Sequence, residues 1–132
     1  MKHTCNVLFL SFLLISLGSF SKADIPVFTG KWDMSCETHS MTLFLVQNDK
    51  QIVGTYDVPH ASGCIGYIIG TMKGNRFDFE FHEVDYGGSV ATFNGTGELI
   101  ISQDGNAIEG KISGVFDSGE KYEAKWTGTR LD

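Results

Sequence analysis

Side chains that could catalyse a reaction or bind a metal are few and widely spaced in this sequence. The histidines beyond the N-terminal region fall in three different segments, as His39, His60 and His82. Asp57 lies near His60, and Glu83 and Asp85 follow His82. Neither group has the HxH or HExxH spacing that sets two metal ligands on one face, and no nucleophile elbow is present. We therefore expect a protein without enzymatic activity, bound metal or cofactor.

The folded part of the chain is expected to begin after a predicted N-terminal signal peptide. Lys2 precedes an apolar run over residues 7–20, and small residues flank the site after Ala23. We expect cleavage there, which leaves one secreted or periplasmic domain over residues 24–132.

The predicted mature chain is acidic. Without Lys2 and Lys22 it has 8 basic residues against 16 acidic ones, a net charge of −8 with histidine neutral. Such a surface repels phosphate groups and anionic lipids, which argues against nucleic-acid binding and membrane insertion. We interpret the acidic surface as a feature that keeps the protein soluble. The alternative interpretation is that it attracts a basic partner.

Alternation of apolar and polar residues predicts an all-β fold. In the fifth predicted strand, Phe77, Phe79 and Phe81 alternate with polar residues, so one face is apolar and the other polar. Turn residues separate eight such segments, around residues 28–34, 41–46, 51–56, 64–72, 77–82, 91–101, 108–113 and 122–130. The prediction is an eight-stranded antiparallel up-and-down (meander) β-barrel.

The predicted interior carries no charged group. It consists of Trp32, Met34, Met41, Leu43, Leu45, Ile52, Tyr56, Ile68, Phe77, Phe79, Phe81, Ala91, Phe93, Leu99, Ile108, Ile112 and Tyr122. Either these side chains fill the barrel or they leave room for an apolar ligand.

Cys36 and Cys64 are the cysteines of the predicted mature chain, and in an oxidising compartment a disulfide between them is expected. In the chain-entropy model it would stabilise the fold by about 3 to 4 kcal/mol. Three strand steps of about 4.8 Å separate the two residues along the wall, whereas a bridge needs Cα atoms within about 7 Å. We therefore expect loops 37–40 and 58–63 to lean inward and partly stopper the barrel mouth.

The Gly30-x-Trp32 opening and the basic Arg130 in the last strand resemble the calycin barrels, which include lipocalins, avidins and small periplasmic metalloprotease inhibitors. The resemblance implies that Trp32 closes the barrel base with an arginine over its ring, a cation–π contact of about 1 to 2 kcal/mol. We expect Trp126 at the same base. Biotin binding is a remote possibility that the resemblance to avidins implies, with Tyr56 as the counterpart of a tyrosine that donates to the biotin ureido oxygen.

Two functions follow from these patterns and stay open at this point. The first is a non-enzymatic binding protein for a small apolar ligand or a protein partner. The second is a periplasmic inhibitor of a protease or other hydrolase that acts through its rim or an N-terminal arm. The candidate contact residues are Tyr56, His39, His60, Tyr86 and Phe116, and the candidate arm is Asp24, Ile25, Pro26 and Val27.

Overall fold

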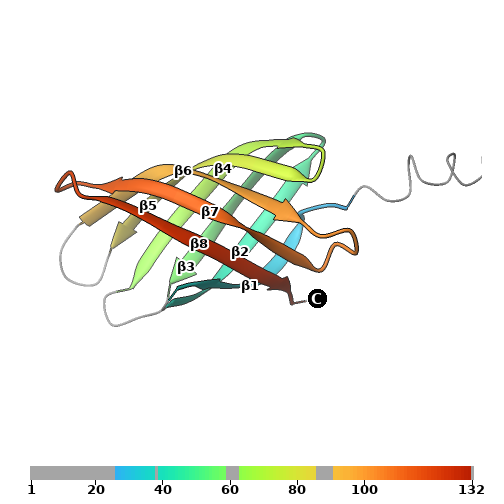
Figure 1. The fold of residues 1–132 in the computed structure, drawn as a ribbon, viewed down its shortest axis with the longest axis horizontal. Coiled ribbons are helices and arrows are strands. Elements are labelled where there is room, and N and C mark those ends of the chain that lie inside the picture. Colours follow the sequence, from blue (N-terminus) through green and yellow to red (C-terminus); the bar gives the residue numbers. More distant parts are fainter. Residues whose placement is uncertain (1–25, 38, 59–62, 86–90, 132) are drawn as a thin grey trace, which may run out of the picture.

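The computed structural model describes residues 26–37, 39–58, 63–85 and 91–131. Eight strands form a closed antiparallel barrel in sequential order, and β8 pairs with β1 (Figure 1). The strands are β1 (Gly30–Cys36), β2 (His39–Asn48), β3 (Gln51–Val58), β4 (Cys64–Lys73), β5 (Arg76–Asp85), β6 (Ala91–Ile101), β7 (Ala107–Phe116) and β8 (Lys121–Arg130). The predicted all-β meander barrel is confirmed. The predicted signal peptide and its cleavage site lie outside the described residues.

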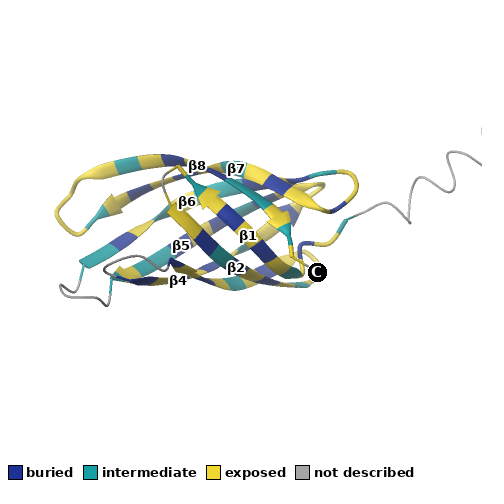
Figure 2. Cartoon of the chain, turned by 90° about the horizontal axis from the view of Figure 1, so that it is seen from below, coloured by how far each residue is buried: buried dark blue, intermediate teal, exposed yellow. Residues whose placement is uncertain are grey.

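Side-chain burial follows the period of two that the sequence shows. Buried and exposed positions alternate along each strand, which gives the banded pattern of Figure 2. Every predicted interior residue is buried except Ala91 and Tyr122, which are half-buried. The interior also takes in Phe28, Val58, Cys64, Met72, Ile101, Ala124 and Trp126. No described residue belongs to a helix with the length and apolarity needed to cross a membrane.

Glycine at one wall position allows two strands to approach closely. A Cβ on Gly110 of β7 would overlap the carbonyl oxygen of Glu98 on β6. The alternation predicts an inward-facing residue at this position, and any side chain there would force the two strands apart. The glycine therefore permits the tight coiling that a narrow barrel requires.

One end of the barrel, which we call the base, lies at the start of β1 and the end of β8 (Figure 1). Phe28 is fully buried there, with its ring centroid 5.6 Å from that of Phe77. Trp32 Nε1 donates a hydrogen bond to the Phe28 carbonyl at 2.9 Å. Gly30 turns the chain from this segment into β1 with φ of 149°, in a region that favours glycine.

Arg130 ties three segments together at the base. Its guanidinium carbon lies 4.3 Å from the centroid of the Trp32 ring. Nη1 and Nη2 donate to the carbonyls of Thr29 and Val27 at 2.6 and 2.7 Å, and Nε donates to the Gly105 carbonyl at 2.9 Å. The chain before β1 and the β6–β7 turn are thus held to the end of β8.

Candidate ligand-binding site

A hollow of about 400 Å³ lies at the opposite end of the barrel, which we call the mouth. At this end β1 and β3 finish and β2 and β4 begin. Its wall combines aromatic and aliphatic side chains with two thiols, one imidazole and two carboxylates. The lining residues are Cys36, His39, Met41, Val58, Cys64, Glu83, Asp85, Phe93, Ile112, Phe116, Tyr122 and Trp126. We refer to this hollow as the mouth pocket.

Trp126 lines the mouth pocket rather than the base, which corrects the expectation that both tryptophans close the base. β8 runs from Lys121 at the mouth to Arg130 at the base, and Trp126 lies between them, opposite Cys36 on β1. The Trp126 ring packs edge-on against Tyr56 with centroids 5.5 Å apart. The tryptophan therefore belongs to the layer beneath the pocket.

Stacked aromatic rings form one side of the mouth pocket. Phe93 on β6 stacks on Phe116 at the end of β7, with ring centroids 4.5 Å apart. Phe81 lies 5.1 Å from Phe93 and 6.3 Å from Trp126, centroid to centroid. Phe93 and Phe116 line the pocket and give an aromatic surface against which a flat apolar molecule could lie, while the fully buried Phe81 packs beneath them.

No buried residue in the described part of the chain is charged, as expected, but two half-buried carboxylates lie at the mouth. The inward face of β5 carries Phe77, Phe79 and Phe81, and the same period of two carries on to Glu83 and Asp85. Both carboxylates consequently line the pocket. The hydroxyl of Tyr56, which is buried, donates to Glu83 Oε1 at 3.0 Å.

A second tyrosine–carboxylate pair lies at the same end. The Tyr122 hydroxyl donates to Glu37 Oε2 at 3.0 Å, which links the start of β8 to the residue that follows β1. Burial and this hydrogen bond raise the pKa of Tyr122 to about 12. Burial, with the charge of Glu83 as a further cause, also raises the pKa of Tyr56 above its ordinary value. Both phenols therefore stay protonated at neutral pH.

The two cysteines line the pocket as separate thiols, and the expected disulfide is not formed in the structure. β2 and β3 lie between β1 and β4, so three strand spacings of about 4.8 Å separate the cysteines along the wall. The regular pairing of Cys36 with His39 and of Cys64 with Val58 keeps them in their own strands. The expectation that loops 37–40 and 58–63 stopper the mouth stays untested, because residues 38 and 59–62 lie outside the described residues.

The electrostatic environment of the pocket disfavours negative charge on these thiols. Burial, followed by the charges of Glu83 and Asp85, raises the pKa of Cys64 to about 12. Burial raises the pKa of Cys36 as well, although the indole N–H of Trp126 opposes this rise. Burial, reinforced by the nearby carboxylates, thus keeps both thiols protonated at neutral pH.

The indole nitrogen of Trp126 is a buried donor without a regular hydrogen bond. Trp126 is 2% exposed, and its Nε1 has no hydrogen-bond partner of regular geometry among the described residues. The indole N–H acts on the Cys36 sulfur, where it lowers the pKa of the thiol, but sulfur is only a weak hydrogen-bond acceptor. Buried donors are normally satisfied, so this N–H is a point at which an added acceptor atom would be stabilised.

The predicted contact residues divide between the pocket and the rest of the molecule. His39 and Phe116 line the pocket, and Tyr56 lies beneath it with its hydroxyl donated to Glu83. His60 and Tyr86 lie outside the described residues, as do Asp24 and Ile25 of the predicted arm. The rest of that arm, Pro26 and Val27, lies at the base, where the Val27 carbonyl accepts from Arg130. The described part of the arm and the mouth pocket are therefore at opposite ends of the barrel.

The carboxylates and His82 of β5 point to opposite faces of the wall. His82 Nδ1 lies 2.8 Å from Asn94 Oδ1 on β6, and its ring stacks on Tyr67 with centroids 4.8 Å apart. Tyr67 is exposed on the outer face. Among the described residues, no group of three or more histidine, cysteine, aspartate or glutamate side chains could hold a metal ion.

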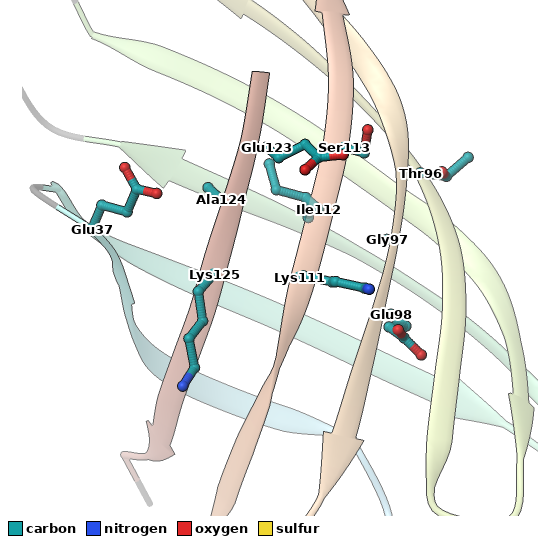
Figure 3. Close-up of a pocket in the computed structure, with 10 residues that line it drawn as sticks. All are labelled: Glu37, Thr96, Gly97, Glu98, Lys111, Ile112, Ser113, Glu123, Ala124 and Lys125. Atoms are coloured by element: carbon teal, nitrogen blue, oxygen red, sulfur yellow. The ribbon is translucent and has the colours of Figure 1, made fainter. Parts of the chain in front are cut away.

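A second hollow, of about 520 Å³, lies over β6, β7 and β8 (Figure 3). Six of its lining side chains are polar or charged, with both signs of charge present, and they are largely exposed to solvent: Thr96, Glu98, Lys111, Ser113, Glu123 and Lys125. Lys111 extends from β7 toward Glu98 on β6 (Figure 3). Exposed charges of mixed sign hold a ligand weakly, so the mouth pocket is the stronger candidate site.

The sequence analysis did not place Glu83, Asp85 and Trp126 in the site, although counting residues along their strands would have found all three. Extending the Phe77-Phe79-Phe81 alternation by two more steps places Glu83 and Asp85 on the inner face. Counting back from Arg130 at the base places Trp126 partway up β8. Comparison with protein-family models, with curated proteins and with solved structures found no match to this chain.

Proposed function

We propose that this protein is a non-enzymatic, calycin-like binding protein that holds a small, largely apolar ligand in the mouth pocket. The observation that carries the proposal is a pocket of about 400 Å³ with aromatic and aliphatic walls, at one end of a barrel filled elsewhere by its own side chains. That volume falls in the range typical of small-molecule sites. The predicted signal peptide supports a proposed site of action outside the cytoplasm.

The thiol chemistry of the pocket supports binding rather than catalysis. A cysteine nucleophile is activated by a lowered pKa, which supplies thiolate near neutral pH. The pKa values of Cys36 and Cys64 are raised instead, chiefly by burial. Neither cysteine has the electrostatic environment of an activated nucleophile.

A fluorescent apolar probe tests the proposal directly. Neutral N-phenylnaphthylamine should bind the protein lacking residues 1–23 with saturable fluorescence enhancement. Val58→Phe places a larger side chain in the pocket and should weaken binding about tenfold, since the site would have to expand to admit the probe. Val53→Phe is the matched control, because Val53 lies on the same strand but faces outward and is 47% exposed.

Two results would contradict the proposal. One is the absence of saturable binding by the folded protein. The other is equal probe affinity in the two phenylalanine variants, which would place the probe somewhere other than the mouth pocket. Biotin belongs in the same titration series, and we expect no binding because the Tyr56 hydroxyl is already donated to Glu83.

A further inference from the structure

We propose that two copies of this protein associate through the outer wall of β2, β3 and β4, over a surface that we call the apolar face. The face consists of large apolar side chains that point away from the barrel interior and are about half exposed: Phe44, Val46, Val53, Ile65, Tyr67 and Ile69. None of them lines the mouth pocket, so this interface is independent of the proposed function and goes beyond it.

Strand pairing makes the apolar face continuous. Its residues lie in rows that cross β2, β3 and β4 in register, and two of the rows are Val46, Val53 and Ile69, followed by Phe44, Thr55 and Tyr67. Side chains paired directly across antiparallel strands have Cβ atoms about 4.5 to 5.5 Å apart, which is contact distance for apolar groups. The face is therefore one patch rather than a scatter of separate exposed residues.

The apolar face differs in charge from the opposite side of the barrel. The two rows across β2, β3 and β4 contain no charged residue. The outward positions of β7 and β8 instead carry Glu109, Lys111, Glu123 and Lys125, all of which are exposed. Because the core of a protein interface is depleted in charged residues, the β2–β4 side has the composition of an interface core and the β7–β8 side does not.

The size of the apolar face fits a second copy. Its half-exposed side chains present about 500 Å² of apolar surface, which is near the upper end for the largest patch on a monomer. Pairing two such faces would bury about 1,000 Å² in total, the size that a specific interface needs. The polar neighbours in the same rows would add to this area.

The shape of the apolar face also suits pairing. The outer wall of a barrel is convex, which limits the contact between two barrels. Here the larger side chains of Phe44 on β2 and Tyr67 on β4 flank the smaller Thr55 on β3. Bulk on both sides of a small centre flattens the convex wall, so two faces can meet over three strands.

Charges of opposite sign border the apolar face on its two sides. Lys31 on β1 is paired with Phe44, and its Nζ lies 5.7 Å from the centroid of the Phe44 ring. Glu80 on β5 is paired with Ile69 on β4. A two-fold axis parallel to the strands brings the Lys31 side of one copy toward the Glu80 side of the other. The face is thus complementary to itself, as a symmetric dimer requires.

Sedimentation velocity of the protein lacking residues 1–23 tests the proposal. Across protein concentrations of about 1 to 200 µM, we expect the mass to rise from that of a monomer to that of a dimer, since an interface of this size gives affinities in or below that range.

Lysine substitutions locate the interface on the apolar face. Val53→Lys places a charge at the centre of the face, where the second copy would remove water from it, so the dimer dissociation constant should rise at least about tenfold. Ile69→Lys should act in the same way and serves if Val53→Lys does not fold. Val115→Lys is the matched control and should leave the dissociation constant unchanged, because Val115 points outward on β7 and is 42% exposed, against 47% for Val53.

A charge exchange tests the two-fold arrangement. Glu80→Lys sets like charges against each other at both borders and should weaken the dimer. Adding Lys31→Glu to Glu80→Lys restores unlike charges and should recover most of the lost affinity. If the double variant is as weak as Glu80→Lys alone, the two-fold arrangement is wrong.

Three other results would overturn the proposal. One is a monomer mass at every concentration. The second is a dimer that survives both Val53→Lys and Ile69→Lys, or one that Val115→Lys weakens equally, because the contact then lies elsewhere. The third is a monomer that binds phosphatidylcholine vesicles and loses this binding in Val53→Lys, which would assign the face to lipid instead of a second copy. Binding of N-phenylnaphthylamine in the mouth pocket is measured separately, so none of these results decides the proposed function.

Discussion

The guanidinium of Arg130 lies 4.3 Å from the ring centroid of Trp32 while it donates to the Val27, Thr29 and Gly105 carbonyls. One side chain thereby joins the first and last strands, the segment before β1 and the β6–β7 turn. The planar fork of arginine supplies donors in several directions, which the ammonium of lysine cannot reproduce.

Arg130→Ala should lower the free energy of unfolding by about 2 to 3 kcal/mol, from the lost hydrogen bonds and the lost cation–π contact. Arg130→Lys should give an intermediate loss. Urea unfolding with linear extrapolation measures both. Lys111→Ala on the exposed outer wall is the control and should change the value by less than about 0.5 kcal/mol. A loss no larger than that of the control would show that the base does not depend on Arg130.

Tyr56→Phe should lower the free energy of unfolding by about 1 to 2 kcal/mol, because it leaves the Glu83 carboxylate without the Tyr56 hydrogen bond. Tyr67→Phe removes a hydroxyl from an exposed outer position and should have little effect. Equal stability of the two variants in urea unfolding would argue that the Tyr56–Glu83 bond contributes nothing net.

Both cysteines should remain thiols in the purified protein lacking residues 1–23. Thiol–disulfide exchange and alkylation require thiolate, and burial raises the pKa of Cys36 and Cys64. Titration with a thiol reagent at about pH 8 should be slow for the folded protein and should count both thiols after unfolding without reductant. A count near zero would show that the two residues had formed a disulfide.

Stability should fall as the pH rises from about 9 to about 12. The pKa of Cys64 is raised to about 12 and that of Tyr122 to about 12, so the folded state holds these protons more tightly than the unfolded chain, whose thiols and phenols titrate near 8.5 and 10. Their stabilising contribution is complete below the unfolded pKa values and is lost as the pH approaches the folded ones. Urea midpoints measured across this range test the effect.

Two variants localise the alkaline effect. Tyr122→Phe removes one titrating group and should make the decline shallower. Glu37→Gln removes a negative charge that helps to raise the pKa of Tyr122, so the same direction is expected. If neither variant changes the slope, Tyr122 does not contribute to the alkaline loss of stability.

The sequence predicted the barrel well because its main signal is local. Alternation such as that of Phe77, Phe79 and Phe81 decides the buried face of a strand whatever its neighbours are. Turn residues mark the boundaries between strands and so give their number. The short connections then favour a meander, in which consecutive strands are neighbours. The structure confirms this fold class.

The candidate site was harder to predict because it depends on height within the barrel as well as on face. Trp126 and Trp32 both point inward, yet they lie at different levels because they occupy different places along their strands. Glu83 follows the inward face of β5, and a carboxylate is tolerated there because this end of the strand lies at the mouth, near solvent. The hydrogen bond from Tyr56 to Glu83 joins residues far apart in sequence, and no local pattern encodes it.

Pairing of β8 with β1 leaves the barrel wall without an unpaired outer strand. Another polypeptide therefore has no exposed backbone ladder to extend, which is the usual route by which flat sheets recruit further chains. Association between copies through the described barrel wall would use its outer side chains, where Phe44 and Val46 are exposed on β2 beside Val53 on β3. A change of a few outer-wall side chains would therefore be enough to alter any association through the barrel wall.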